Sequence, residues 1–180
     1  MKFLVLLFSV GVWAKGGEHR HHEGHVHGSA QLNLAFDDLQ GKLEFKGAAE
    51  GVVGFEHEAK SEKDKKTLAE VVQKFENSLA QMVVFDSSLG CEFTKEKLGL
   101  QTEEKESKKA GTKKHRHHHA EHADFVAEFN IQCKSPVKGS TVKFDFTIFP
   151  RLKDIDVTFL MGDLQKSLEV KSKPVSLELK

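Results

Sequence analysis

The sequence predicts a single α+β domain in which a mostly antiparallel β-sheet is packed by one main amphipathic helix. Two blocks of alternating apolar and polar residues indicate the strands, and apolar residues at helical spacing between about 62 and 81 indicate the helix. No internal repeat of fixed period interrupts this pattern. A chain of 180 residues is long enough for one domain with a core and some flexible segments. We expect residues 28–180 to form that domain.

The first β block starts close to Gly28. Ala30, Leu32 and Leu34 alternate with more polar neighbours, which is typical of a half-buried strand. A turn cluster follows at 37–41, and a second alternating stretch continues beyond it. The region 29–47 is therefore predicted to be a hairpin.

The helix is predicted from its start signal and its apolar face. Ser61 and Asp64 resemble a capping pair. The apolar positions that follow at helical spacing are Leu68, Val71, Val72, Phe75 and Leu79. One face of this helix should cover the sheet. Cys91 and Phe93 then suggest a strand over about 91–98.

The second half of the chain is richer in β pattern. Apolar and polar residues alternate over 125–133, 142–148, 155–159, 168–170 and 175–179. Pro136, Gly139, Pro150 and Gly162 separate these stretches. Short strands with turn residues between them favour an antiparallel sheet.

Residues 1–14 have the pattern of a secretory signal peptide. Lys2 precedes an apolar run that ends at Trp13, and Val12 and Ala14 suit the −3 and −1 pockets of a signal peptidase. The alternative is a buried N-terminal strand. No other stretch reaches the roughly 20 apolar residues of a membrane helix, so we expect no membrane insertion of the mature protein. Secretion would place the protein in an oxidising compartment outside the cytoplasm.

The charge and the cysteine content of the chain further limit its possible binding partners and the chemistry of its cysteines. The chain has 27 basic and 27 acidic residues, so no positive excess is present to hold nucleic acid or an anionic membrane. Cys91 and Cys133 are the only cysteines. In an oxidising compartment such a pair is most simply a disulfide, and the alternative is a pair of thiolate metal ligands.

Histidine is the outlier of the composition. Ten of the 11 histidines lie in the windows 19–27 and 115–122. The first window belongs to an arm over 15–27, and all of the second except His122 lies in a loop at about 101–120 that lacks large apolar residues and should be disordered. Neutral imidazole suits Zn²⁺, Cu²⁺ and Ni²⁺, so both tracts are candidate metal-binding segments. The alternative is a solvated polar tail. The candidate weaker ligands are His19, His21, His22, His115, His117, His118 and His119.

A better-defined metal site is predicted from strand phase. His25 and His27 are out of phase with the core residues of the first strand, as are His122 and Asp124 in the strand at 125–133. Each pair has i, i+2 spacing and so occupies one face of a strand. His57 lies between two glutamates and is either a surface residue or a further ligand. Nitrogen and oxygen ligands from these positions, with Glu56 as a further candidate, would suit tetrahedral Zn²⁺.

Enzyme motifs are missing from the sequence. HExxH, GxSxG, the P-loop and GxGxxG do not occur, and HHEGH at 21–25 has the wrong spacing. We therefore expect no enzymatic activity. A metal-dependent hydrolase that uses Glu56 or Glu58 as general base is the weakest alternative.

Four segments together resemble a known family. They are HVHGSAQLNLAF at 25–36, VGFEHEA at 53–59, GC at 90–91, and the His tract leading into EHADFVAEFNIQC at 121–133. This order is similar to that of the ZrgA family of zinc-regulated periplasmic proteins of Gram-negative bacteria. The resemblance covers about 25–180. It implies zinc binding, an α+β fold with a mobile His-rich loop, and a helper role beside the high-affinity zinc ABC importer.

The resemblance also implies which residues bind the metal. The motif histidines of the family correspond to His25, His27, His57 and His122, with Asp124 beside the last. The loop departs from the family pattern because it is rich in lysine and has few acidic residues near its histidines. The expected function is capture of Zn²⁺ and its transfer, with the solute-binding component of the importer as partner. The alternative is a structural or interaction module whose histidine tracts sense pH.

Overall fold

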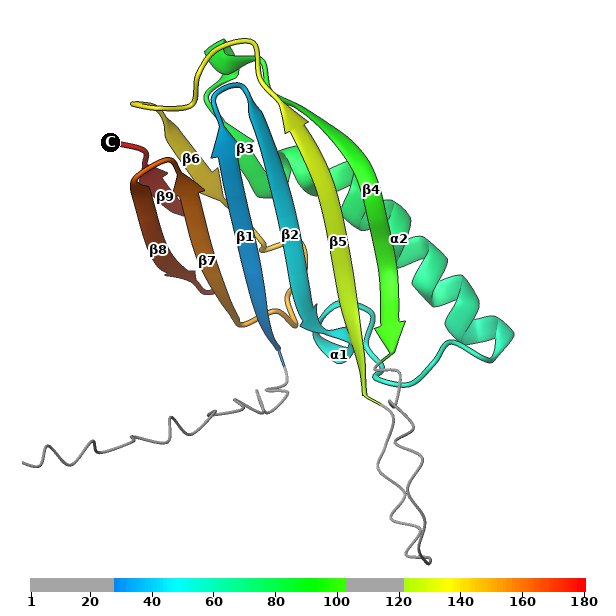
Figure 1. Cartoon of the computed structure of the whole chain (residues 1–180). Helices are drawn as coiled ribbons and strands as arrows, with labels where there is room; N and C mark the ends of the chain where they lie inside the picture. The colour runs from blue at the N-terminus through cyan, green and yellow to red at the C-terminus, as the bar shows by residue number, and fades with distance from the viewer. Residues whose placement is uncertain (1–27, 103–121) are drawn as a thin grey trace, which may run out of the picture.

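A computed structural model describes residues 28–102 and 122–180 (Figure 1). The predicted signal peptide and arm, and nearly all of the predicted loop, lie outside these residues. The strands are β1 Ser29–Asp37, β2 Gln40–Ala48, β3 Val83–Phe85, β4 Glu92–Thr102, β5 Ala123–Gln132, β6 Thr141–Phe144, β7 Asp154–Met161, β8 Leu164–Val170 and β9 Val175–Glu178. The helices are α1 Ala49–Val52, α2 Glu62–Met82 and the 3₁₀ turn η1 Ser87–Leu89.

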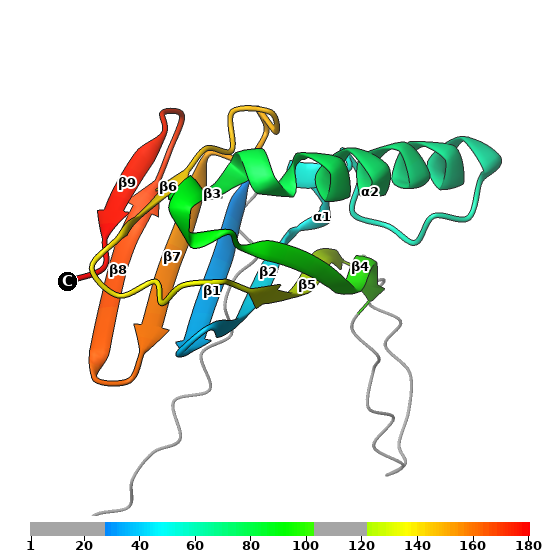
Figure 2. The same cartoon turned by 90° about the horizontal axis from the view of Figure 1, so that it is seen from above.

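Two layers enclose the core. One layer is a six-stranded sheet in the order β4-β5-β2-β1-β7-β8. Figures 1 and 2 show that α2 lies behind the β4–β5 side of this sheet, and that the small sheet β3-β6-β9 lies behind its β7–β8 side. The predicted single α+β domain with one main helix is thereby confirmed.

Local sequence explains the hairpin and the helix. β1 and β2 pair antiparallel as predicted, with the even-numbered residues of β1 buried. The Ser61 hydroxyl accepts a hydrogen bond from the Asp64 amide at 3.1 Å, which confirms the predicted cap. Phe75 of α2 packs against Phe45 and Phe125 of the sheet, each with ring centroids 5.3 Å apart. Helix and sheet therefore share one aromatic core.

Three features differ from the predicted strands. β1 and β7 pair in parallel, whereas we expected antiparallel pairing in this half. β6 ends at Phe144 instead of continuing to 148, because Asp145 accepts hydrogen bonds from the amide and hydroxyl of Thr147 and turns the chain. β4 runs on to Thr102, so 101–102 belong to a strand rather than to the predicted loop.

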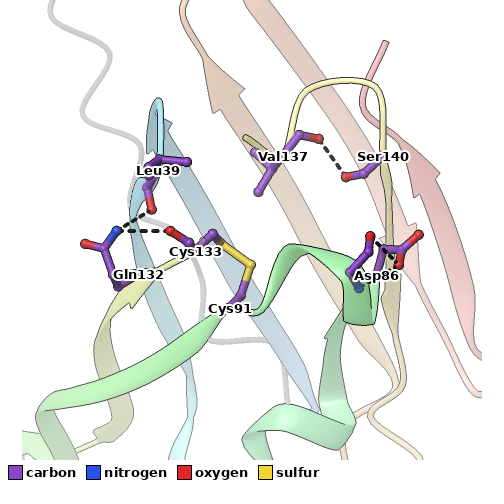
Figure 3. Close-up of a disulfide and its surroundings, with 8 residues drawn as sticks. Leu39, Asp86, Cys91, Gln132, Cys133, Val137 and Ser140 are labelled. Atoms are coloured by element: carbon purple, nitrogen blue, oxygen red, sulfur yellow. Dashed lines mark hydrogen bonds between the residues drawn. A yellow bond between two sulfur atoms is a disulfide. The ribbon is translucent and has the colours of Figure 1, made fainter. Parts of the chain in front are cut away.

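The two cysteines form the predicted disulfide (Figure 3). Cys91 immediately precedes β4, and Cys133 immediately follows β5. The Cys133 amide also donates to the carbonyl of Leu39 at 2.9 Å, which joins this corner to the β1–β2 turn. The alternative of two thiolate metal ligands is therefore wrong.

Candidate metal centre

One end of the six-stranded sheet collects segments that are far apart in sequence. Ala30 of β1 pairs with Gly47 of β2, and Gly47 pairs with Phe125 of β5. The start of β1, the end of β2 and the start of β5 consequently lie side by side. Helix α1 follows β2 at this end, near the point where β4 ends and β5 begins (Figure 1).

Glu56 and His122 meet at this end. The amide of Ala123 donates to the Glu56 carbonyl at 2.8 Å, so the segment after α1 is bound to the start of β5. His122 Nδ1 lies 2.8 Å from Glu56 Oε2, with 46% of the histidine side chain and 20% of the glutamate side chain exposed. An ionised carboxylate only accepts hydrogen bonds, so Nδ1 donates and the lone pair of the neutral ring is on Nε2. Metal-ligating histidines commonly have a carboxylate in this position.

A different contact favours the same tautomer of His57, with the proton on Nδ1. Its Nδ1 lies 3.0 Å from the carbonyl oxygen of Glu58, which also only accepts. Nε2 of neutral His57 therefore carries the lone pair as well. The ring stacks on Phe55 with centroids 4.8 Å apart and planes at 17°, which restricts its rotation.

Asp124 adds a carboxylate on the outer face of the sheet. Its neighbour Phe125 is buried in the core, so the predicted phase of this strand is confirmed. The Asp124 side chain is nevertheless only 7% exposed, and Lys46 Nζ lies 3.0 Å from its Oδ2. Lys46 belongs to β2, where Val126 is its partner in the register. A metal ion that binds Asp124 would have to compete with this ammonium.

The sequence matches the family described as "ZrgA family zinc uptake protein" over residues 24–179. The chain belongs to the ZrgA family. The match includes the hairpin, the Glu56–His57 segment and the start of β5, so it covers every part of the site just described. A role in zinc uptake follows for this ZrgA protein. A search of curated proteins finds no match to the chain.

The predicted ligand set of this ZrgA protein is only partly described. In residues 28–102 and 122–180, no group of three or more His, Cys, Asp or Glu side chains is arranged to hold a metal ion. His25 and His27 lie outside the described residues, as do the weaker candidates His19, His21, His22, His115, His117, His118 and His119. Their participation therefore stays a prediction.

Two contacts of this site could not be read from the sequence of the ZrgA protein. The EHE segment does not reveal that Glu56 rather than Glu58 reaches His122, because that depends on how the segment joins β5. No feature of the local sequence predicts the contact between Lys46 and Asp124, since only the β2–β5 register brings the two residues together. Strand phase was informative for Asp124, which lies in β5, whereas His122 precedes the strand.

One cleft in the described part of the protein lies away from this site. It has a volume of about 410 Å³ at the opposite end of the sheet, where the β1–β2 and β7–β8 turns meet. Its lining includes Phe36, Asp37, Asp38, Met161 and Asp163 but no histidine. The imidazole site is therefore a surface site and not this cleft. In the described part of the chain, no helix has the length and apolar character required to cross a membrane.

Proposed function

We propose that this protein is an exported, non-enzymatic zinc-binding protein that captures Zn²⁺ in the periplasm and assists its delivery to a high-affinity zinc ABC importer. One observation carries the proposal. His122 is held through Nδ1 by the Glu56 carboxylate at 2.8 Å, so its Nε2 has the lone pair that a metal ion needs. Membership of a zinc uptake family makes Zn²⁺ the natural ion.

In this proposal, the fixed site draws its ligands from His25, His27, His57, His122 and Asp124. Imidazole nitrogens with one carboxylate match the ligands of four-coordinate zinc. His57 and His122 both present Nε2, and the Glu56 carbonyl ties their two segments together through the Ala123 amide at 2.8 Å. Gly28 lies at the same end of the sheet, and we include His27, which precedes it in the sequence, in the proposed ligand set.

Delivery requires that the ion leave the protein again. Nearly half of the His122 side chain is exposed, so an incoming ligand can reach the ion directly. Lys46 is positioned to reoccupy Asp124 when the ion leaves, which lowers the cost of release. We assign the two histidine tracts to weaker, exchangeable capture, and the solute-binding component of the importer is the proposed recipient.

The proposal is tested by substitutions at His122 and Glu56. His122→Gln removes a ligand, and Glu56→Gln removes the carboxylate that orients it; we expect each to weaken the tightest zinc site by about 10- to 100-fold. Affinity should be measured by competition with a chelator, because weak binding by the tracts does not register there. The readout is the Zn²⁺ dissociation constant at neutral pH.

Glu58→Gln is the matched control. Glu58 is the neighbouring glutamate, its side chain is 58% exposed, and it pairs with Lys60 instead of a histidine. This variant should retain the wild-type zinc affinity. Absence of zinc binding by the wild-type protein, or equal affinities of His122→Gln and wild type, would refute the proposed site.

A further inference from the structure

Arg151 joins two distant parts of the chain through backbone carbonyls. Its Nε donates to the Glu50 carbonyl at 3.1 Å, and its Nη2 donates to the Val52 carbonyl at 3.0 Å. Both acceptors belong to α1, Ala49–Val52. The Glu50 carbonyl also accepts from the Gly54 amide at 3.0 Å, so the guanidinium adds a second donor there and a donor to the Val52 carbonyl at the end of α1. Its planar fork suits two acceptors at once.

The chain passes from this contact directly to the zinc site. Gly54 has φ of +93°, and a Cβ at this position would lie 3.2 Å from Arg151 Nη2. The chain therefore bends closely over the guanidinium, in a conformation that L residues rarely adopt. Two residues later, Glu56 binds the Ala123 amide and His122 Nδ1, both at 2.8 Å.

The segment that contains Arg151 also holds the start of β1. The amides of Lys153 and Asp154 donate to the Gly28 carbonyl at 2.8 Å and 3.3 Å. A Cβ on Gly28 would come within 2.7 Å of the Arg151 carbonyl oxygen, so the two backbones are in close contact. Gly28 directly follows His27. Residues 151–154 thus contact the segment after α1 that leads to His57, and they also contact Gly28, the residue after His27.

We infer that Arg151 is a positioning residue of the zinc site: it binds no metal, but it fixes the α1–Gly54 segment so that Glu56 orients His122. This inference rests on the proposed function. A purely structural role would predict a loss of stability without a specific loss at the site. The experiment must therefore separate zinc affinity from stability.

Lys74 provides the matched control. Its Nζ donates to the Ile148 carbonyl at 2.9 Å and lies 4.9 Å from the centroid of the Phe149 ring. It is thus a second long cationic side chain that binds a carbonyl across the fold. Lys74 belongs to α2 and contacts the chain shortly before Arg151. Its acceptor, the Ile148 carbonyl, is not part of the segment 50–56.

The test compares Arg151→Lys with Lys74→Met in the full chain. Lysine keeps the charge of Arg151 but has a single nitrogen, so it cannot serve both carbonyls in the same geometry. We expect Arg151→Lys to weaken the tightest zinc site by about tenfold, the lower range for residues that orient a ligand. Lys74→Met should lower the unfolding temperature and leave the zinc affinity unchanged.

Two further measurements complete the design. Gly54→Ala strains the same segment and crowds the Arg151 guanidinium without replacing Arg151, and it should weaken zinc binding to a similar extent. In the zinc-free protein, the ¹H–¹⁵N imidazole spectrum of His122, assigned by comparison with His122→Gln, should change in Arg151→Lys and not in Lys74→Met. This spectrum reports the His122–Glu56 contact independently of zinc.

The zinc affinities and the His122 spectra together decide whether Arg151 positions His122. The inference is overturned if Arg151→Lys keeps both the wild-type affinity and the wild-type His122 spectrum, or if Lys74→Met weakens zinc binding equally. If the wild-type protein binds no zinc, the proposed function fails, and the His122 spectrum alone decides whether Arg151 positions this residue.

Discussion

His57 and His122 are oriented before any metal binds. In each residue an oxygen acceptor faces Nδ1, one from a backbone carbonyl and one from a carboxylate. Neutral rings in this tautomer need no rearrangement of the proton when Nε2 binds an ion. Preorganisation of this kind raises affinity because less conformational freedom is lost on binding.

Asp145 gives a prediction about pH at the residue scale. The Thr147 hydroxyl, 2.7 Å from Asp145 Oδ1, holds the pKa of this carboxyl below its ordinary value. The ionised form is therefore favoured in the folded state. Its stabilisation is complete above the unfolded pKa of about 4 and is lost as the pH falls through the lower folded value.

Asp145→Asn should accordingly reduce the free energy of unfolding at pH 7 but not at pH 2. Urea denaturation of both proteins at the two pH values measures this difference. Thr147→Val should reproduce the effect because it removes the donor hydroxyl. A deficit of equal size at both pH values would contradict the role of the charge.

At this scale the sequence was informative wherever the signal was local. The cap formed by Ser61 and Asp64 and the outward phase of Asp124 both follow from neighbouring residues. The Lys46–Asp124 pair and the Glu56–His122 contact do not, since each joins residues of different elements. Long-range pairing has to be known before such contacts can be assigned.

At the scale of elements, the disulfide secures an edge strand. β4 is the outermost strand on its side of the six-stranded sheet, and its only neighbour there is β5. Cys91 and Cys133 join these two strands at the end opposite to His122, across 42 positions of sequence (Figure 3). The bond therefore restrains the strand pair whose other end carries the proposed zinc site.

Removal of this bond is a test of its contribution. In the chain-entropy model, a loop of this length stabilises the fold by about 4 kcal/mol, so a Cys91→Ala, Cys133→Ala variant should lose about that amount. Chemical denaturation measures the loss. Reducing agent should lower the stability of the wild-type protein similarly and leave the variant unchanged. A loss below about 1 kcal/mol would contradict the model.

Elements with strong periodicity were predictable, and those set by tertiary contacts were not. Helix α2 spans Glu62–Met82, close to the predicted 62–81. The three-residue strand β3 follows it directly and is too short to give a pattern. The parallel pairing of β1 with β7 depends on the whole sheet, and alternation along one strand does not specify its partner's direction.

At the scale of the whole molecule, the sequence places the histidines of 115–119 between β4 and β5. Thr102 pairs with Ala123, so the two strands remain in register up to the point where the described residues stop. The described strands β4 and β5 pair from Glu92–Gln132 to Thr102–Ala123. The fold should therefore tolerate a much shorter connection.

Replacement of residues 103–121 by Asn-Gly tests this expectation. Together with His122 these two residues form a three-residue hairpin loop, a length that antiparallel strands accept. We expect an unfolding free energy within about 1 kcal/mol of wild type. The tight zinc site should remain, and the total zinc bound at saturation should fall.

A full-length control separates the histidines from the length of the loop. Substitution of His115, His117, His118 and His119 by serine should lower the zinc capacity to the same extent. Loss of the tight site in the shortened protein would contradict the assignment of the loop to weaker capture.

The parallel pairing of β1 with β7 has a consequence for synthesis. Ser29 is matched with Asp154, so one of the earliest strands to leave the ribosome lies beside one made only after most of the chain is finished. Contacts between such distant positions delay folding. Because β7 is made late, the six-stranded sheet cannot be completed until the last part of the chain is available.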